Sequence, residues 1–156
     1  MKHLKTCIVI SLDGFIARKD GDLNWMPGNI KKEISAAYEI PSVFIAGVNT
    51  YNMIFRNWGG WPYKSKKTFV VSHYDTNVTR KDNVTFLTDM PLRAINELKS
   101  SSETDIQVIG GGKFITSLIE ASLLDEITLY IVPVMLGDGI KFIGKTFGSK
   151  WELTGH

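Results

Sequence analysis

Residues 105–122 read DIQVIGGGKFITSLIEAS and combine a short apolar run, three consecutive glycines and an amphipathic stretch. This pattern predicts a strand over Asp105 to Ile109, a turn at glycines 110–112, and a helix from about Lys113 to Ser122. Glycine lets a backbone approach a phosphate closely, and the helix N-terminus offers free N–H groups and the positive end of the helix dipole. The segment also suits a tight turn that binds nothing, so on this segment alone both interpretations stay open.

The glycine turn differs from the two common phosphate-binding motifs. Ile115 stands where a Rossmann fingerprint requires its third glycine, and the Lys-Ser or Lys-Thr ending of a P-loop is missing. A dinucleotide site of another architecture remains as the functional interpretation.

A second glycine follows an expected strand in Gly47-Val48-Asn49-Thr50-Tyr51. Gly47 permits close approach, and the Thr50 hydroxyl with the N–H groups of the helix start is suited to a phosphate oxygen. Alone, the segment is better explained as a helix cap. Two such turns in one small chain suit a ligand with a long diphosphate, and the conjunction favours a ligand at both.

A third feature is the exit of the first expected strand, Leu4 to Ser11, into a loop that begins Leu12-Asp13-Gly14. Asp-Gly is a turn signal and needs no functional explanation. A loop of about 14 residues without structure is, however, uncommon unless it covers a site.

Strand-like and helical runs alternate along the rest of the chain. Asn29 and Asp89 are each expected to cap a helix. Glu126 to Val134 is apolar on both faces, which predicts a strand in the middle of a covered sheet. The alternation predicts one α/β domain, residues 1–156, with a mostly parallel sheet, helices on both faces, and a ligand site at the carboxyl ends of the strands.

Composition argues against several function classes. The chain is 44% hydrophobic and 22% charged, with a net charge of +2 spread along it, which is typical of a globular protein without a nucleic-acid partner. No window approaches the roughly 20 apolar residues of a membrane helix, and no signal peptide is visible, so we expect a cytoplasmic protein. The histidines lack metal-ligand spacing, and Cys7 lies in an apolar run without an adjacent base, so we expect no metal site.

Three motifs, in this order, resemble the dihydrofolate-reductase-like superfamily. Residues 11–17, SLDGFIA, are similar to the first-strand signature of the reductase domain of bacterial riboflavin-biosynthesis enzymes. Residues 108–112, VIGGG, resemble the glycine turn of dihydrofolate reductases, and residues 131–139, IVPVMLGDG, resemble the closing segment of small stand-alone relatives of the riboflavin-biosynthesis reductase C-terminal domain. The resemblance covers nearly the whole chain and implies a dihydrofolate-reductase-like three-layer sandwich.

The resemblance implies a site for NADPH, with NADH as the alternative cofactor. Its residues fall into three groups by the part of the cofactor that they would meet. The nicotinamide carboxamide would be held by backbone around Val9, Ile16 and Ala17, with Asp13 and Trp25 lining the cavity nearby. The diphosphate and adenosine end would be met by Gly47, Asn49 and Thr50 from one side and by Gly111, Gly112, Lys113 and Phe114 from the other, with Ser72 and His73 flanking the adenosine ribose.

Several positions depart from the pattern of the relatives. Many relatives carry an Arg that binds the 2′-phosphate of NADP where this chain has Val48, and riboflavin-biosynthesis reductases carry a substrate-binding Glu where it has Ile109. The carboxylate that protonates dihydrofolate aligns with Lys31, and Glu33 is the nearest acid. Relatives usually continue past the point matched by His156 to complete an antiparallel pair of strands, of which only the first is expected here.

We therefore expect an NAD(P)H-dependent oxidoreductase of the dihydrofolate reductase or 5-amino-6-(5-phosphoribosylamino)uracil reductase type. Its substrate would be a small pterin-, flavin- or pyrimidine-like heterocycle. Hydride addition to a C=N or C=O bond needs an acid at the heteroatom, and Asp13 and Glu33 are the candidates for that catalytic proton relay. The alternative is a non-catalytic nucleotide-binding dimer that acts as a sensor or scaffold. In either case the apolar strand residues over 127–136 predict a homodimer.

Overall fold

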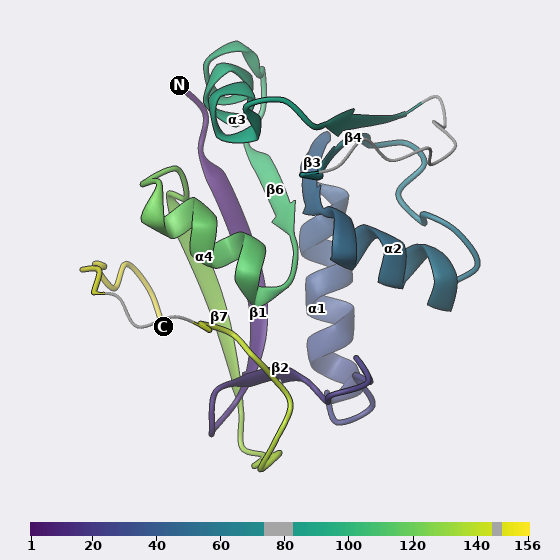
Figure 1. The fold of residues 1–156 in the computed structure, drawn as a ribbon. Helices are drawn as coiled ribbons and strands as arrows, with labels where there is room; N and C mark the ends of the chain where they lie inside the picture. The colour runs from purple at the N-terminus through teal and green to yellow at the C-terminus, as the bar shows by residue number, and fades with distance from the viewer. Residues whose placement is uncertain (74–82, 145–147) are drawn as a thin grey trace.

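A central parallel sheet dominates the computed structural model (Figure 1). The structure describes residues 1–73, 83–144 and 148–156, and within them a six-stranded sheet has the order β5-β4-β3-β6-β1-β7, with every neighbouring pair parallel. Its strands are β1 Leu4–Ser11, β3 Val43–Gly47, β4 Lys67–Val71, β5 Val84–Leu87, β6 Ile106–Ile109 and β7 Glu126–Val132. Two short strands, β2 (Phe15–Ala17) and β8 (Ile140–Lys141), pair with each other antiparallel. The predicted parallel α/β sheet is confirmed.

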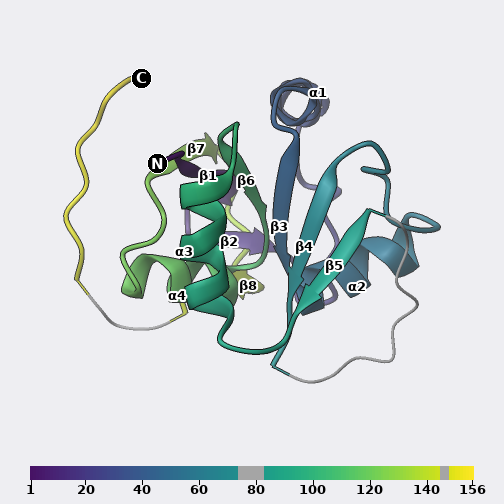
Figure 2. The ribbon, with the colours of Figure 1, turned by 90° about the horizontal axis from the view of Figure 1, so that it is seen from above.

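Helices cover both faces of the sheet, with α1 and α2 on one side and α3 and α4 on the other (Figure 2). In the described ranges these helices are α1 Gly28–Glu39, α2 Val48–Asn57, α3 Pro91–Ser101 and α4 Gly112–Glu120. The arrangement is the three-layer sandwich expected from the sequence. Within the same ranges, every helix is too short or too polar to cross a membrane.

Alternation along the strands divides the core into two clusters. On β3, Phe44 faces α1 and α2 and packs with Tyr51 of α2, whereas Ile45 faces the other helices and packs with Ile95 of α3. Helix α1 is packed more loosely than the others, because it has no fully buried residue and contributes the partly buried Tyr38 to its cluster. The side of α1 that faces the sheet is therefore half-buried.

The strand β7 lies at the edge of the sheet and pairs, among the described strands, with β1 alone. Its side chains Leu129 and Ile131 are 46% and 64% exposed. The prediction of a covered central strand over Glu126 to Val134 is therefore wrong. Two-sided apolarity shows that a strand can be covered on both faces, and it carries no information on which strands lie beside it.

Two predicted helix caps are wrong as well. Helix α1 begins at Gly28 after Pro27, so Asn29 lies inside its first turn. The N-cap of α3 is Met90, at a left-handed φ of 40°, and Asp89 precedes it. The loop after β1 also contains β2, a strand that the sequence did not predict.

Candidate functional site

The starts of α2 and α4 meet at the carboxyl end of the sheet. The backbone N–H of Gly111 donates to Oγ1 of Thr50 at 2.9 Å. Gly47 and Gly111 are the two N-caps, and neither helix has a side-chain cap or an acidic residue in its first turn. Unpaired N–H groups at two adjoining helix starts, without a competing carboxylate, suit a diphosphate. The two glycine turns predicted to act together are therefore neighbours, and they fit the phosphate part of a dinucleotide.

Gly112 is required by packing against β8. A Cβ built on Gly112 would lie 2.2 Å from the carbonyl oxygen of Phe142 and 2.4 Å from that of Lys141. Both distances are far below van der Waals contact. The third glycine of the turn therefore lets β8 approach α4, a reason that differs from the close approach of a phosphate considered from the sequence.

Gly47 and Gly111 occupy different environments. A Cβ on Gly47 would lie 3.1 Å from Cβ of Phe114, so this glycine makes room for the Phe114 ring. A Cβ on Gly111 would lie 3.4 Å from Oγ1 of Thr50, which is ordinary contact with a side chain of the facing helix start. Gly111 is thus the position at which a larger side chain would enter the space between the two helix starts.

The residues expected to hold the nicotinamide lie on β1 and β2. Val9 is buried in β1, and Ile16 and Ala17 lie in β2, directly after the turn at residues 12–14. Strand β8 pairs with β2 and also lies against Gly112. The expected nicotinamide side and the expected diphosphate side are therefore connected through β8.

Three hydrogen bonds occupy the carboxylate of Asp13. The Ser11 hydroxyl donates to Oδ1 at 2.6 Å, the Leu136 N–H donates to Oδ1 at 3.1 Å, and the Gly137 N–H donates to Oδ2 at 2.7 Å. The Ser11 hydroxyl, followed by these two amides, holds the pKa of Asp13 below its usual range. A carboxyl group that stays ionised is a poor proton donor at neutral pH, so this geometry favours a structural role for Asp13.

The residues expected beside the adenosine ribose follow β4. Ser72 is 1% exposed, and its backbone N–H donates to the Leu87 carbonyl at 3.0 Å. His73 is exposed, as is Lys113 at the start of α4. Asn49 lies exposed in the first turn of α2. The assignment of these residues to a bound cofactor stays a prediction.

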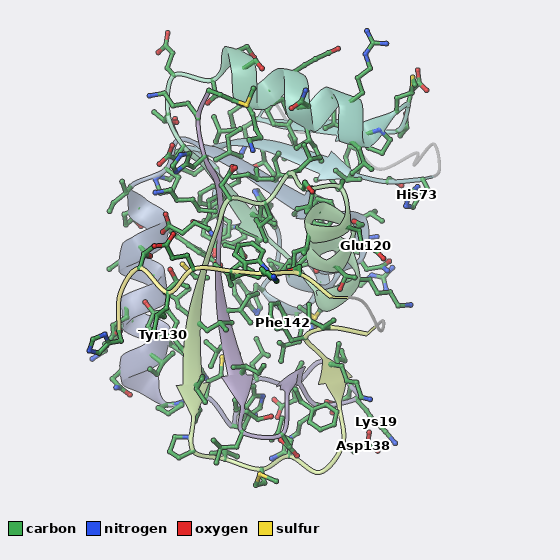
Figure 3. The ribbon with its side chains drawn as sticks, turned by 90° about the vertical axis from the view of Figure 1, so that its left-hand side faces the viewer. Lys19, His73, Glu120, Tyr130, Asp138 and Phe142 are labelled. Atoms are coloured by element: carbon green, nitrogen blue, oxygen red, sulfur yellow. The ribbon has the colours of Figure 1, made fainter. Side chains whose placement is uncertain are left out.

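A group of residues lies between α1 and the strands β1 and β7, and of these residues the sequence singled out Glu33 alone as part of a site. Burial raises the pKa of Tyr38 and that of Tyr130, and the nearby Cys7 thiol adds to both shifts. The charge of Glu33 on α1 also raises the pKa of Tyr130, which places this exposed carboxylate near the phenol. Figure 3 shows Tyr130 on the α1 side of β7.

Strand register explains why this group forms. Cys7 and Val9 are alternate residues of β1 and share a face, and Tyr130 is the partner of Val9 on β7. The period of two was visible in the sequence, but the pairing of β1 with β7 was not.

Trp25 lies half-buried in the loop before α1, and its indole Nε1 is buried without a hydrogen-bond partner among the described residues. A buried donor left unpaired costs about 1–3 kcal/mol, so the indole is a candidate donor to a bound molecule. Within residues 1–73, 83–144 and 148–156, no three His, Cys, Asp or Glu residues lie close enough together to hold a metal ion.

Sequence relatives are consistent with this arrangement. Residues 2–156 match the family model of the RibD C-terminal domain. The chain is 27% identical over 152 residues to YwjB, an uncharacterized protein of Bacillus subtilis (strain 168), with 95% of this chain and 87% of that protein covered.

Solved structures share the fold. A protein of Shewanella sp. PV-4 that is ascribed to riboflavin biosynthesis is 29% identical, with a TM-score of 0.79 over 94% of this chain and 86% of that one. The Enterococcus faecalis dihydrofolate reductase complexed with NADP(H) has a TM-score of 0.66 at 18% identity, over 91% of this chain and 79% of its own, and so shares the fold alone. Because the family model matches almost every residue, the chain belongs to the RibD C-terminal domain family.

Proposed function

We propose that residues 1–156 form a single domain that binds NADPH and reduces a small heterocyclic substrate by hydride transfer. The observation that carries this proposal is the pair of uncapped helix starts, α2 and α4, joined by the bond between Thr50 and Gly111 beside β2. Membership of a family named for a riboflavin-biosynthesis protein supports it. NADH is the alternative cofactor, and the cytoplasm is the compartment that we propose.

The cofactor would lie along the carboxyl ends of β1, β3, β4 and β6. When bound, it supplies the hydride, and the protein supplies binding and orientation. The diphosphate would be held by the helix starts, the carboxamide by the backbone of β1 and β2, and the ribose by the end of β4. These three regions contain, in order, residues 47–50 with 111–114, residues 9, 16 and 17, and residues 72 and 73.

The substrate would lie between α1 and the strands β1 and β7. Cys7 and Tyr130 give this region half-buried side chains, which suit a flat, largely uncharged ring, and Trp25 lies half-buried in the loop before α1. Ile109, in place of the Glu of riboflavin-biosynthesis reductases, argues against their phosphoribosyl substrate. A pterin-, flavin- or pyrimidine-like ring without that group is the substrate class that we propose.

Glu33 is the proton donor that we propose, in preference to Asp13. Its carboxylate lies near Tyr130 on the substrate side of α1 and, among the described residues, makes no hydrogen bond or ion pair. It is therefore free to exchange a proton with a substrate atom or with an ordered water.

NADPH oxidation over a panel of dihydropterins, flavins, pyrimidines and quinones tests the proposal. Wild type should turn over at least one class, and Glu33→Gln should lower kcat by at least about 100-fold while leaving NADPH affinity unchanged. Glu39→Gln, an exposed acid in the last turn of the same helix, is the matched control and should retain full activity. Failure of wild type to bind NADPH would exclude the proposed function.

A non-catalytic nucleotide-binding dimer is the second candidate function. The exposed apolar residues Leu129 and Ile131 on the edge strand β7 favour self-association, which we propose for either function. This candidate predicts tight NADPH binding with no oxidation of the cofactor by any member of the panel.

A further inference from the structure

Strand β8 contacts both halves of the proposed cofactor site. On one side it pairs with β2, where Ala17 lies opposite Ile140. On the other side the carbonyl oxygens of Lys141 and Phe142 lie against Gly112, where a Cβ would come within 2.4 Å and 2.2 Å of them. The segment that contains β8, residues 133–142, therefore spans the space between the expected nicotinamide side and the expected diphosphate side.

Asp13 holds this segment at Leu136 and Gly137. The N–H groups of Leu136 and Gly137 donate to its two carboxylate oxygens, across 123 and 124 positions of the chain. The Ser11 hydroxyl donates to Oδ1 and also accepts the N–H of Phe15 at 2.9 Å. One hydrogen-bond network thus joins the segment, the turn after β1 and the first residue of β2.

Close backbone packing fixes the segment along β2. A Cβ on Gly139, whose φ is 151°, would lie 2.2 Å from the carbonyl oxygen of Ala17. The Phe142 N–H donates to the Gly14 carbonyl at 3.1 Å. Between the Asp13 contacts and β8, Asp138 forms an ion pair with Lys19 (Figure 3). Backbone meets backbone at these points, so the spacing between the segment and β2 has little freedom.

We propose that residues 133–142 act as a brace that sets the position of β2 relative to the glycine turn, and that Asp13 is the positioning residue that holds this brace in place. The consequence for binding rests on the proposed function. With the brace in place, the backbone of β2 and the helix starts would be able to hold one NADPH molecule at the same time. Asp13 acts through Leu136 and Gly137 rather than by contact with the cofactor.

Two ligands separate positioning from general loosening of the fold. NADPH spans both halves of the site, whereas adenosine 2′,5′-bisphosphate carries the adenosine half alone. Asp13→Ala should weaken NADPH at least about tenfold and leave the bisphosphate within about threefold of wild type. Asp13→Asn keeps one acceptor oxygen for the two amides, so its NADPH affinity should lie between that of wild type and that of Asp13→Ala. Asp20→Ala is the control, because Asp20 accepts the Asp22 N–H within the same loop at 3.0 Å and bonds to nothing in the brace.

Amide hydrogen exchange reports on the brace without any ligand. The amides of Leu136 and Gly137 should exchange at least about tenfold faster in Asp13→Ala and unchanged in Asp20→Ala. Gly139→Ala, which forces the brace away from the Ala17 carbonyl of β2, should reproduce the selective loss of NADPH affinity and keeps the test open if Asp13→Ala fails to fold.

The outcomes distinguish the two proposals. If wild type binds NADPH and Asp13→Ala binds it equally well, or if both ligands weaken together, the positioning role is overturned and the proposed function stands. If wild type binds neither ligand, the proposed function fails and the positioning role fails with it.

Discussion

Replacing Gly112 with Ala should damage the fold far more than the same change at Gly111. The added methyl group at Gly112 meets two backbone carbonyl oxygens at 2.2 Å and 2.4 Å, whereas at Gly111 it meets a hydroxyl oxygen at 3.4 Å. These carbonyls belong to Lys141 of the paired strand β8 and to Phe142 directly after it, so this backbone or the start of α4 must move by roughly 1 Å to restore contact. That movement also strains the pairing of β8 with β2.

Overpacking of this kind costs typically about 1–3 kcal/mol, and the contact with backbone atoms of residues 141 and 142 puts Gly112→Ala at the upper end. Ala gains at most about 1 kcal/mol of helix propensity over Gly, and less than that in a first turn. We therefore expect a net loss of about 2–3 kcal/mol, which for a chain of this size lowers the melting temperature by about 4–12 °C. Gly111→Ala should change the free energy of unfolding by less than about 1 kcal/mol.

Thermal and urea unfolding of the two variants measure the difference in stability, and NADPH titration measures binding. Gly111→Val, which places a larger side chain in the space between the helix starts, should leave the fold intact and weaken NADPH binding by at least about tenfold. A Gly112→Ala protein as stable as wild type would refute the packing of β8 against the turn. Unchanged NADPH affinity in a folded Gly111→Val protein would remove the turn from the site.

Three further measurements test other parts of the structure. Val48 supplies no charge to a 2′-phosphate, whereas an Arg typically contributes about 1.5–3 kcal/mol to its binding. NADPH should therefore bind less than about 100-fold more tightly than NADH in parallel titrations. A larger ratio would mean that another cation binds the 2′-phosphate. If the protein forms the proposed homodimer, Ile131→Lys should give a monomeric mass by light scattering, and a monomeric wild type would refute the proposed homodimer. The His3 N–H and then Lys5 hold the pKa of Asp105 below its usual range. The stability that this carboxylate adds is therefore present above about pH 4 and is lost as the pH falls through the lowered pKa. Asp105→Asn should reduce the fall of the melting temperature in acid, and an unchanged fall would count against this role of Asp105.

Local pattern was enough to predict the parallel sheet and both glycine turns. The strand Leu4–Ser11 has the predicted bounds, and the turns at Gly47 and Gly111 follow strands and open helices as expected. These features depend on neighbours within a few residues. The position of β7 at the edge depends on which strand lies beside it, and apolar strands at an edge and in the middle of a sheet look alike in sequence.

The chemical roles of individual residues depended on contacts that no local pattern contains. Gly112 faces residues 141 and 142, and Asp13 bonds to amides 123 and 124 positions away. From the sequence, both residues were expected in the site, where Gly112 would meet the diphosphate and Asp13 would take part in the proton relay. Their neighbours explain them better as the two anchors of one brace.

The surroundings of Asp13 and Glu33 favour different tasks for two carboxylates of the proposed site. The Ser11 hydroxyl and two amides stabilise the ionised form of Asp13, so giving it a proton would require breaking the bonds that hold the brace. Glu33 is exposed beside Tyr130, and its carboxylate makes no hydrogen bond or ion pair within the described residues. In the proposed reaction Glu33 would therefore supply the proton, and Asp13 would hold the backbone of residues 136 and 137 in position.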